Sequence, residues 1–247
     1  MTDRRILKVS GADSEEFLQG LITNDMAKLA QGPIYAALLT PQGKYLADFF
    51  VVPAPDGILI DVAAALGDML KQRLSMYKLR AKVEIADTDL HLHRGTGPVP
   101  EDGFADPRTD GMGWRALRDT PQDSTADTTN WDALRVAHIV PETGIELTPD
   151  TFPLEVGFER LNGVDFRKGC YVGQEVTARM KHKTTLRKGL ARVAMDGEAP
   201  VGTEITAEGK AAGTLLTQAG DQALAYLRFD RAAGPMQAET AKVTWSP

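Results

Sequence analysis

Hydrophobic and polar residues change their spacing several times along the 247-residue chain, and each change predicts a different element. Two apolar runs, residues 34–39 and 45–52, flank a short turn that contains Pro and Gly, which predicts a buried β-hairpin. Residues 66–77 carry apolar side chains at helical spacing, and after Lys78 apolar and polar residues alternate. We therefore expect a helix that gives way to a strand near Lys78.

Two further helices are indicated by the signals at their ends. Asp13 followed by Glu16 has the spacing of a capping box at the start of an N-terminal helix, which we expect to pack on the hairpin. Residues 131–139 resume the helical period. The Pro-Glu-Thr-Gly sequence of residues 141–144 ends that helix.

The middle and the end of the chain differ in pattern from the rest. Residues 94–130 are rich in Gly, Pro, Asp and Thr, which predicts a boundary, a shortened subdomain or a partly mobile segment. After Lys188, short apolar or alternating runs are separated by Gly-containing turns, as in a small antiparallel barrel of about 60 residues. We therefore expect a body, residues 1–183, and a C-terminal β-barrel domain, residues 184–247.

The composition is that of an ordinary globular chain, with 43% hydrophobic and 25% charged residues. The N-terminus shows no secretory leader, and no apolar run approaches the length that spans a bilayer. With one cysteine, no disulfide can form within the chain. These features predict a cytoplasmic protein in a reducing compartment, without a membrane partner.

The net charge of −6 is distributed unevenly. Residues 160–192 contain nine Lys or Arg and two acids, which gives +7 there and −13 in the remainder. Such a stretch is either a solvated basic face or a site for an anionic ligand. The acidic remainder and the few aromatic residues in the stretch argue against direct nucleic-acid binding.

The single cysteine, Cys170, is the first candidate for chemistry. Gly169 and Gly173 on either side allow the backbone to turn and leave the sulfur open. Lys168, two residues earlier, favours the thiolate, which is the reactive and metal-binding form. A buried cysteine that acts only as a small apolar side chain is the alternative.

Other cysteine chemistry has less support. A cysteine hydrolase needs a base, and the sequence places neither His138 nor His182 beside the thiol. A closed metal site needs about four nitrogen or sulfur ligands, and no such spacing occurs, so we predict no metal site. The chain also lacks a Walker loop and a GxGxxG turn, which argues against nucleotide hydrolysis and Rossmann redox chemistry.

Two polar clusters end predicted helices. Thr23-Asn24-Asp25 can bind a ring with several donors and acceptors, or can form an ordinary Asn/Asp turn. Tyr77-Lys-Leu-Arg80 places cations near the negative pole of a helix, where they either complement the helix dipole or bind a ligand.

A family resemblance follows from these motifs. Lys168-Gly-Cys-Tyr-Val-Gly-Gln-Glu175 resembles the K-G-C-Y-x-G-Q-E signature of the YgfZ-type folate-binding proteins. That family is related to the T-protein (aminomethyltransferase, GcvT) of the glycine cleavage system and has mitochondrial counterparts in iron–sulfur assembly. Further matches cover most of the chain, at residues 11–25, 39–44, 77–83 and 163–168.

The resemblance implies an α+β, GcvT-like folate-binding fold, in which a pseudo-symmetric α/β body surrounds a central channel and precedes a small C-terminal β-barrel. It also implies a tetrahydrofolate-binding accessory protein for assembly or repair of iron–sulfur proteins, including tRNA-modifying enzymes. Its partners are then folate and iron–sulfur client or assembly proteins. The alternative is an aminomethyltransferase or another folate-dependent one-carbon transferase, with Asp48 as the carboxylate near the folate nitrogen; the other interpretation of Asp48 is a surface acid at a strand end.

The predicted site combines these motifs. Trp131 corresponds to a family tryptophan beside the folate, whereas a second family tryptophan has no counterpart in residues 1–10. The basic stretch is expected to hold the glutamate tail of the folate, which often carries several glutamates. We predict Cys170 and Asp48 as catalytic residues, and as folate contacts Asn24, Asp25, Tyr77, Arg80, Trp131, Lys168, Gly169, Tyr171, Gly173, Gln174, Glu175 and Arg179.

Overall fold

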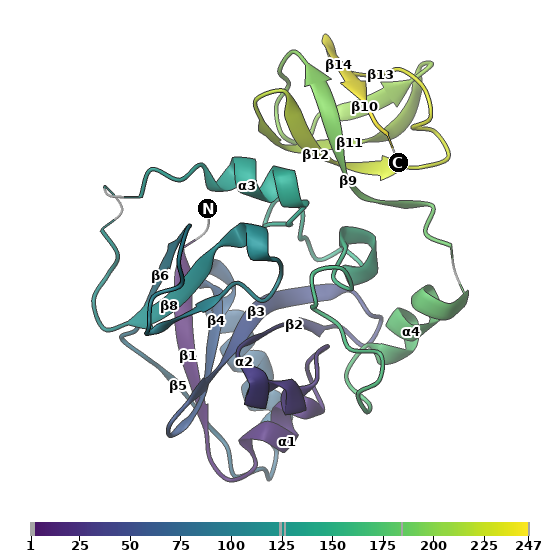
Figure 1. The fold of residues 1–247 in the computed structure, drawn as a ribbon. Coiled ribbons are helices and arrows are strands. Elements are labelled where there is room, and N and C mark those ends of the chain that lie inside the picture. Colours follow the sequence, from purple (N-terminus) through teal and green to yellow (C-terminus); the bar gives the residue numbers. More distant parts are fainter. Residues whose placement is uncertain (1–2, 124, 126, 184, 247) are drawn as a thin grey trace.

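The computed structural model describes residues 3–123, 125, 127–183 and 185–246. The chain forms an α+β body and a closed C-terminal β-barrel, which lie at opposite ends of the view in Figure 1. The predicted fold class is confirmed by this architecture. The predicted division between the two parts falls at residue 184, which lies outside the described residues.

A five-stranded antiparallel sheet is the centre of the body, with the order β2-β3-β4-β1-β5. The predicted hairpin is confirmed as β2 and β3, in which Ala37 pairs with Asp48. Every residue of β2 is buried, so both faces of the sheet are covered. The strands are β1 (Arg4–Ser10), β2 (Ile34–Leu39), β3 (Tyr45–Ala54), β4 (Gly57–Ala63) and β5 (Glu84–Asp87).

Helices cover the first face of the sheet. They are α1 (Ser14–Gln19), the short 3-10 helix η1 (Met26–Gln31) and α2 (Ala64–Lys78), and α2 lies behind the sheet in Figure 1. Leu18, Phe49 and Leu70 are completely buried in the core of this face. Among the described residues, no helix is both long and apolar enough to cross a membrane.

The predicted capping box of α1 is absent. The Asp13 side chain makes no capping hydrogen bond to the helix. Its Oδ2 instead accepts a hydrogen bond of 2.7 Å from the backbone N–H of Lys82. Asp13 therefore connects α1 to the loop after α2, a contact between segments that the local sequence pattern does not reveal.

The connection after α2 also differs from the prediction. The helix ends at Lys78 and β5 begins only at Glu84, so the alternating residues between them form an irregular turn. Leu79 has φ of +44° and ψ of −103°, a conformation that bulky residues rarely adopt and that costs about 1–3 kcal/mol. Its side chain is 89% exposed.

The second face is covered by the middle of the chain. Residues 94–130 were expected to form a boundary, a shortened subdomain or a mobile segment, and the structure places a small sheet there, with the order β6-β8-β7. The predicted helix at 131–139 is confirmed as α3 (Trp131–His138). The strands are β6 (His91–Gly95), β7 (Gly103–Ala105) and β8 (Trp114–Arg118).

A buried ion-pair network joins this small sheet to the central sheet. Asp61 of β4 pairs with Arg4 at 2.6 Å and with Arg115 of β8 at 2.5 Å. Asp106 pairs with Arg108 at 2.8 Å and lies 3.6 Å from Arg115. Burial alone would raise the pKa of the Asp61 carboxyl, but Arg4 and Arg115 outweigh it and lower that pKa. Because an unpaired buried charge typically costs about 3–5 kcal/mol, the network fixes how the middle segment packs.

The C-terminal strands close into a barrel with the order β10-β11-β12-β9-β14-β13, as predicted. The barrel has a core of its own, which includes Ile205, Leu215 and Leu227. Its strands are β9 (Lys188–Asp196), β10 (Glu204–Ala207), β11 (Lys210–Ala219), β12 (Gln222–Arg228), β13 (Met236–Ala238) and β14 (Ala241–Thr244). Among these six strands, only β13 does not correspond to one of the short apolar or alternating runs of the sequence.

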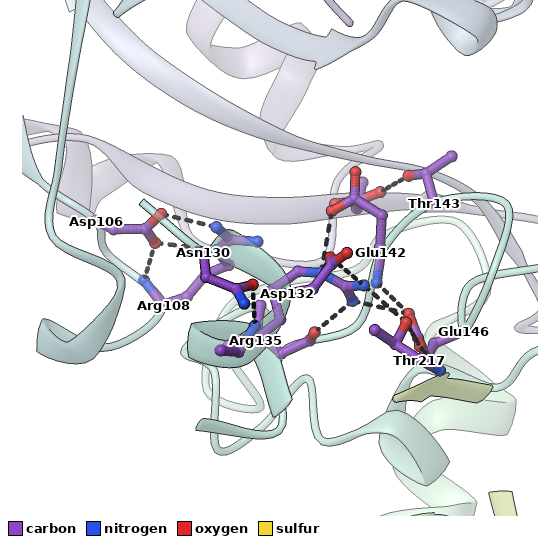
Figure 2. Close-up of polar contacts among 12 residues, drawn as sticks. Asp106, Arg108, Asn130, Asp132, Arg135, Glu142, Thr143, Glu146 and Thr217 are labelled. Atoms are coloured by element: carbon purple, nitrogen blue, oxygen red, sulfur yellow. Dashed lines mark hydrogen bonds and ion pairs between the residues drawn. The ribbon is translucent and has the colours of Figure 1, made fainter. Parts of the chain in front are cut away.

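Arg135 of α3 connects the body to the barrel (Figure 2). This completely buried guanidinium donates hydrogen bonds to Glu146 at 3.0 Å and to the Thr217 hydroxyl of β11 at 2.8 Å. The Thr217 hydroxyl in turn donates to Glu146 at 2.6 Å. A charged pair shared with a barrel residue therefore holds the two parts together.

Candidate functional site: the Cys170 loop

Cys170 lies on the loop that precedes α4 (Gln174–Lys183), and its side chain is exposed, as predicted. The exposure excludes the alternative of a buried apolar cysteine. Among the described residues, no group of three or more His, Cys, Asp or Glu is arranged to hold a metal ion. Cys170 therefore stands as a single accessible thiol.

Lys168 anchors this loop to the segment that contains the end of α1. Its ammonium is buried and donates hydrogen bonds to the backbone carbonyls of Gln19 at 2.7 Å and Ile22 at 2.5 Å. Carbonyls at a helix C-terminus lack partners within the helix, so a cation there satisfies them. Lys168 therefore has a structural role, and its expected effect on the thiol stays a prediction.

The pKa of Lys168 reflects this position. Burial lowers it to about 8, against the opposing attraction of Asp25 and Asp165. The Nζ atom also lies 4.9 Å from the centre of the Tyr171 ring. Tyr171 itself is buried, which raises the pKa of its hydroxyl to about 12. Lys168 and Tyr171, which flank the exposed pair Gly169 and Cys170, are thus held inside the protein.

Thr23 connects the same loop segment to the central sheet. Its hydroxyl donates to the carbonyl of Gly163 at 2.6 Å and accepts from the backbone N–H of Ala37 at 2.8 Å. Its carbonyl accepts from the backbone N–H of Asp165 at 3.0 Å. Two segments about 140 residues apart in the chain are therefore joined at one buried threonine.

Asn24 is engaged in the same way. Its amide nitrogen donates to the carbonyls of Tyr35 and Asn162, both at 2.7 Å. Its amide oxygen accepts from the Lys28 ammonium at 3.1 Å and from the Asp25 backbone at 2.9 Å. Asn24 also borders a hollow of about 260 Å³. The groups expected to bind a ring are thus already used to hold residues 162–165.

Two carboxylates complete this support. Asp25 caps η1 through the backbone N–H of Ala27 at 3.0 Å. Asp165 pairs with Lys28 at 2.7 Å and accepts from the backbone N–H of Arg167 at 2.7 Å. Burial would raise the pKa of Asp165, but Lys28 and the Arg167 N–H outweigh it and lower that pKa.

The two motif glycines have different roles. Gly173 has φ of +85°, and a Cβ atom there would lie 2.6 Å from the carbonyl oxygen of Thr40, so the β2–β3 turn packs directly against the start of α4. Gly169 has no positive φ, and nothing lies within 4 Å of its potential Cβ. The expectation that both glycines serve the backbone therefore holds only for Gly173.

The remaining motif residues begin α4. Gln174 is its first residue, and Glu175 pairs with Arg179 at 2.8 Å one turn later. Both charged side chains are largely exposed, so this pair contributes at most about 1 kcal/mol. These residues form a polar surface that follows the cysteine loop.

Asp48 is buried and is not a surface acid at a strand end. Its carboxylate accepts hydrogen bonds from the hydroxyls of Tyr35 at 3.0 Å, Tyr45 at 2.7 Å and Thr143 at 2.7 Å. Burial, reinforced by the Asp48 charge, raises the pKa of both tyrosines. The carboxylate thus has three protein donors on the second face of the sheet.

The predicted aromatic contacts lie on opposite faces of the sheet. Tyr77 packs against the core under the helices, whereas Trp131 belongs to the core of the second face. The Arg94 guanidinium lies over the Trp131 ring, 4.2 Å from the ring centre. The indole N–H of Trp131 donates a hydrogen bond of 2.7 Å to the Asp127 carboxylate. Burial, with a smaller effect of Arg115, lowers the pKa of Arg94 to about 10.

The basic stretch is divided as well. Arg160 donates to two backbone carbonyls, whereas Lys183, Arg187 and Lys188 border a cavity of about 560 Å³ between α4 and the barrel. This cavity is lined by Glu155, Met180, Lys183, Thr185, Leu186, Arg187, Lys188 and Arg228. Its excess of cations fits an anionic ligand.

Comparison with solved structures defines the fold. A glycine cleavage system aminomethyltransferase T from Bartonella henselae superposes with a TM-score of 0.78 over 98% of this chain and 83% of that chain, at 15% identity. Residues 187–247 match the family model of the CAF17 C-terminal beta-barrel domain. The fold is therefore that of an aminomethyltransferase body with a CAF17-type barrel, and the predicted GcvT-like fold is confirmed.

Sequence relatives define the family. The mitochondrial iron–sulfur cluster assembly factor IBA57 of Mus musculus is 31% identical over 97% of this chain and 79% of its own length. The Homo sapiens protein is 30% identical over 94% and 78%. A Mycosarcoma maydis homologue is 33% identical, but the chain spans only 54% of its length. This chain belongs to the IBA57 family.

The Lys168 anchor gives a pH-dependent prediction. Its folded pKa of about 8 lies below the usual lysine value of about 10.4, so the unfolded chain binds more protons between these values. Stability that depends on Lys168 should therefore rise with pH in this window. We expect the difference in free energy of unfolding between the wild type and Lys168→Met to increase in favour of the wild type from about pH 7 to about pH 9.5, measured by urea titration. Lys181→Met at an exposed ion pair is the control, and an unchanging Lys168 difference would contradict the account.

Proposed function

We propose that this protein acts in the assembly or repair of iron–sulfur cluster proteins, and that Cys170 is the residue that meets the cluster or a partner's thiol. The observation that carries the proposal is an exposed cysteine on a loop that buried contacts hold in place. The names of its relatives, which are iron–sulfur cluster assembly factors, support it. The clients we propose include enzymes that modify tRNA.

A single thiol limits the number of cluster ligands that this protein can supply. The thiolate is the form of cysteine that binds iron, and clusters take about four protein ligands. Cys170 can supply one, so the other ligands must come from a partner. The cluster is then a substrate shared with, or passed between, two proteins.

The compartment is a separate question. The relatives are mitochondrial by name. The cytoplasmic location expected from this sequence stays a prediction, as does the absence of a membrane or nucleic-acid partner.

Replacement of the thiol tests the proposal. Cys170→Ala removes one exposed sulfur, so we expect an unchanged melting temperature and a loss of rescue of an iron–sulfur client enzyme in a strain that lacks the protein. The readout is the client's activity and its iron content. Full rescue by Cys170→Ala would show that the thiol is not required for this function.

Folate-dependent one-carbon transfer is a second candidate, favoured by the likeness of the fold to an aminomethyltransferase. Tetrahydrofolate is then the ligand, and the cations around the large cavity suit its glutamate tail. The expected pterin contacts are already engaged within the protein. A pterin on Trp131 must displace Arg94, and one at Asn24 must replace hydrogen bonds that support the cysteine loop.

Thermal unfolding with tetrahydrofolate tests this candidate. A ligand that binds only the folded state raises the melting temperature, and we expect a rise that shrinks in high salt because the tail contact is electrostatic. Methylene transfer that survives Cys170→Ala and is lost in Asp48→Asn would identify a transferase. The absence of any shift at saturating folate would count against folate binding.

A further inference from the structure

The end of α2 exposes two large apolar side chains. Leu79 is 89% exposed and Met76 is 63% exposed. Met76 lies in the last turn of α2, and Leu79 is the residue that directly follows the helix. Among the described residues, the other exposed large apolar side chains are Val99 and Val201. Adjacent exposed apolar residues of this size are typical of interaction sites.

The backbone at Leu79 gives no folding reason for this exposure. Its φ is +44°, at a position after a helix where glycine is the usual residue because it has no Cβ. The neighbouring Tyr77 already packs into the core of the first face. A residue with a strained backbone and a side chain that is not packed in the core is typical of a functional position.

The chain segment around Leu79 is positively charged, and the acids beside it are Asp13, which accepts from the Lys82 backbone N–H, and Glu84 at the start of β5. Residues 73–82 contain four cations, Arg73, Lys78, Arg80 and Lys82, and no acid, in a chain of net charge −6. Within the described part of the chain, none of these four side chains forms an ion pair or a hydrogen bond. In contrast, Lys71 one turn earlier pairs with Asp87 at 2.6 Å.

This surface and the Cys170 loop flank the same short helix. The loop after α2 contacts the start of α1 through the Lys82 N–H and Asp13. Lys168, two residues before Cys170, contacts the last residue of α1, Gln19. Because α1 has six residues, its ends are about 9 Å apart. In Figure 1, α1 lies at the end of the body opposite the barrel.

We propose that Met76, Leu79 and the four cations form a docking surface for an acidic amphipathic helix of a partner protein, whose apolar face contacts Leu79. Charge complementarity selects the occupant, because unpaired cations on an acidic chain attract an acidic partner and orient it. An occupant of this surface reaches past α1 to the Cys170 loop. The statement that this occupant shares the cluster rests on the proposed function. The docking of an acidic partner does not depend on that function.

The test uses a fluorescein-labelled amphipathic helical peptide with leucines on one face and glutamates on the other, and fluorescence anisotropy as the readout. Leu79→Gly removes the side chain and relieves the positive φ, so we expect an unchanged or higher melting temperature. We expect peptide affinity to fall about tenfold or more, because a buried leucine contact is lost. Arg80→Gln with Lys82→Gln should weaken binding and reduce its salt dependence.

The matched control is Val201→Gly, which removes an exposed apolar side chain from the barrel and should leave peptide affinity unchanged. A peptide with glutamine in place of glutamate should not bind. No binding of the acidic peptide by the wild type, or equal binding by Leu79→Gly, would overturn the proposal. So would Leu79-dependent binding to phosphatidylcholine–phosphatidylglycerol vesicles or to single-stranded RNA in place of the peptide.

Cys170→Ala distinguishes the docking proposal from the proposed role of the thiol in iron–sulfur assembly. The variant should bind the peptide like the wild type and fail to rescue the client enzyme, whereas Leu79→Gly should lose both peptide binding and rescue. Full rescue by Cys170→Ala with peptide binding still dependent on Leu79 would refute the thiol chemistry and leave the docking surface standing.

Discussion

The hydrogen bonds that join residues 19–24 to residues 162–168 are the constraint on which the site depends. Thr23 and Asn24 hold the segment before the motif, and Lys168 fixes the motif itself to the end of α1. The donor side chains, Thr23, Asn24 and Lys168, are buried, so leaving any one of them unpaired costs about 1–3 kcal/mol. An exposed cysteine is therefore presented on a loop with little freedom to move.

Under the proposed function, this arrangement would allow a single thiol to take part in cluster transfer. A loop held at both ends presents its sulfur at a fixed position, so a partner that supplies the remaining ligands can meet it without an ordering cost. The buried Asp61 and Arg115 pair fixes the middle segment, and Arg135 fixes the barrel. The surface at Leu79 would then orient the partner on the same side of the body.

The sequence predicted the elements with strong local patterns and missed those set by distant contacts. The hairpin, α3 and the barrel follow from periodicity and turns, and the motif marked Cys170 correctly as exposed. The folate contact of Asn24 stays a prediction, whereas its hydrogen bonds to the carbonyls of Tyr35 and Asn162 had no signal in the local sequence. The Asp61 network left no signal, since single charged residues in short strands resemble surface residues. The Arg94 guanidinium lies over the Trp131 ring, and the two residues come from separate elements, so the local sequence did not predict this contact either.

Amide hydrogen exchange in Thr23→Val tests the central claim most directly. Valine keeps the shape of threonine and removes the hydroxyl that donates to Gly163 and accepts from Ala37. The account predicts that the amides of residues 163–168 exchange at least about tenfold faster while those of β3 and β4 keep their protection. Unchanged protection of residues 163–168 would show that the cysteine loop does not depend on this contact.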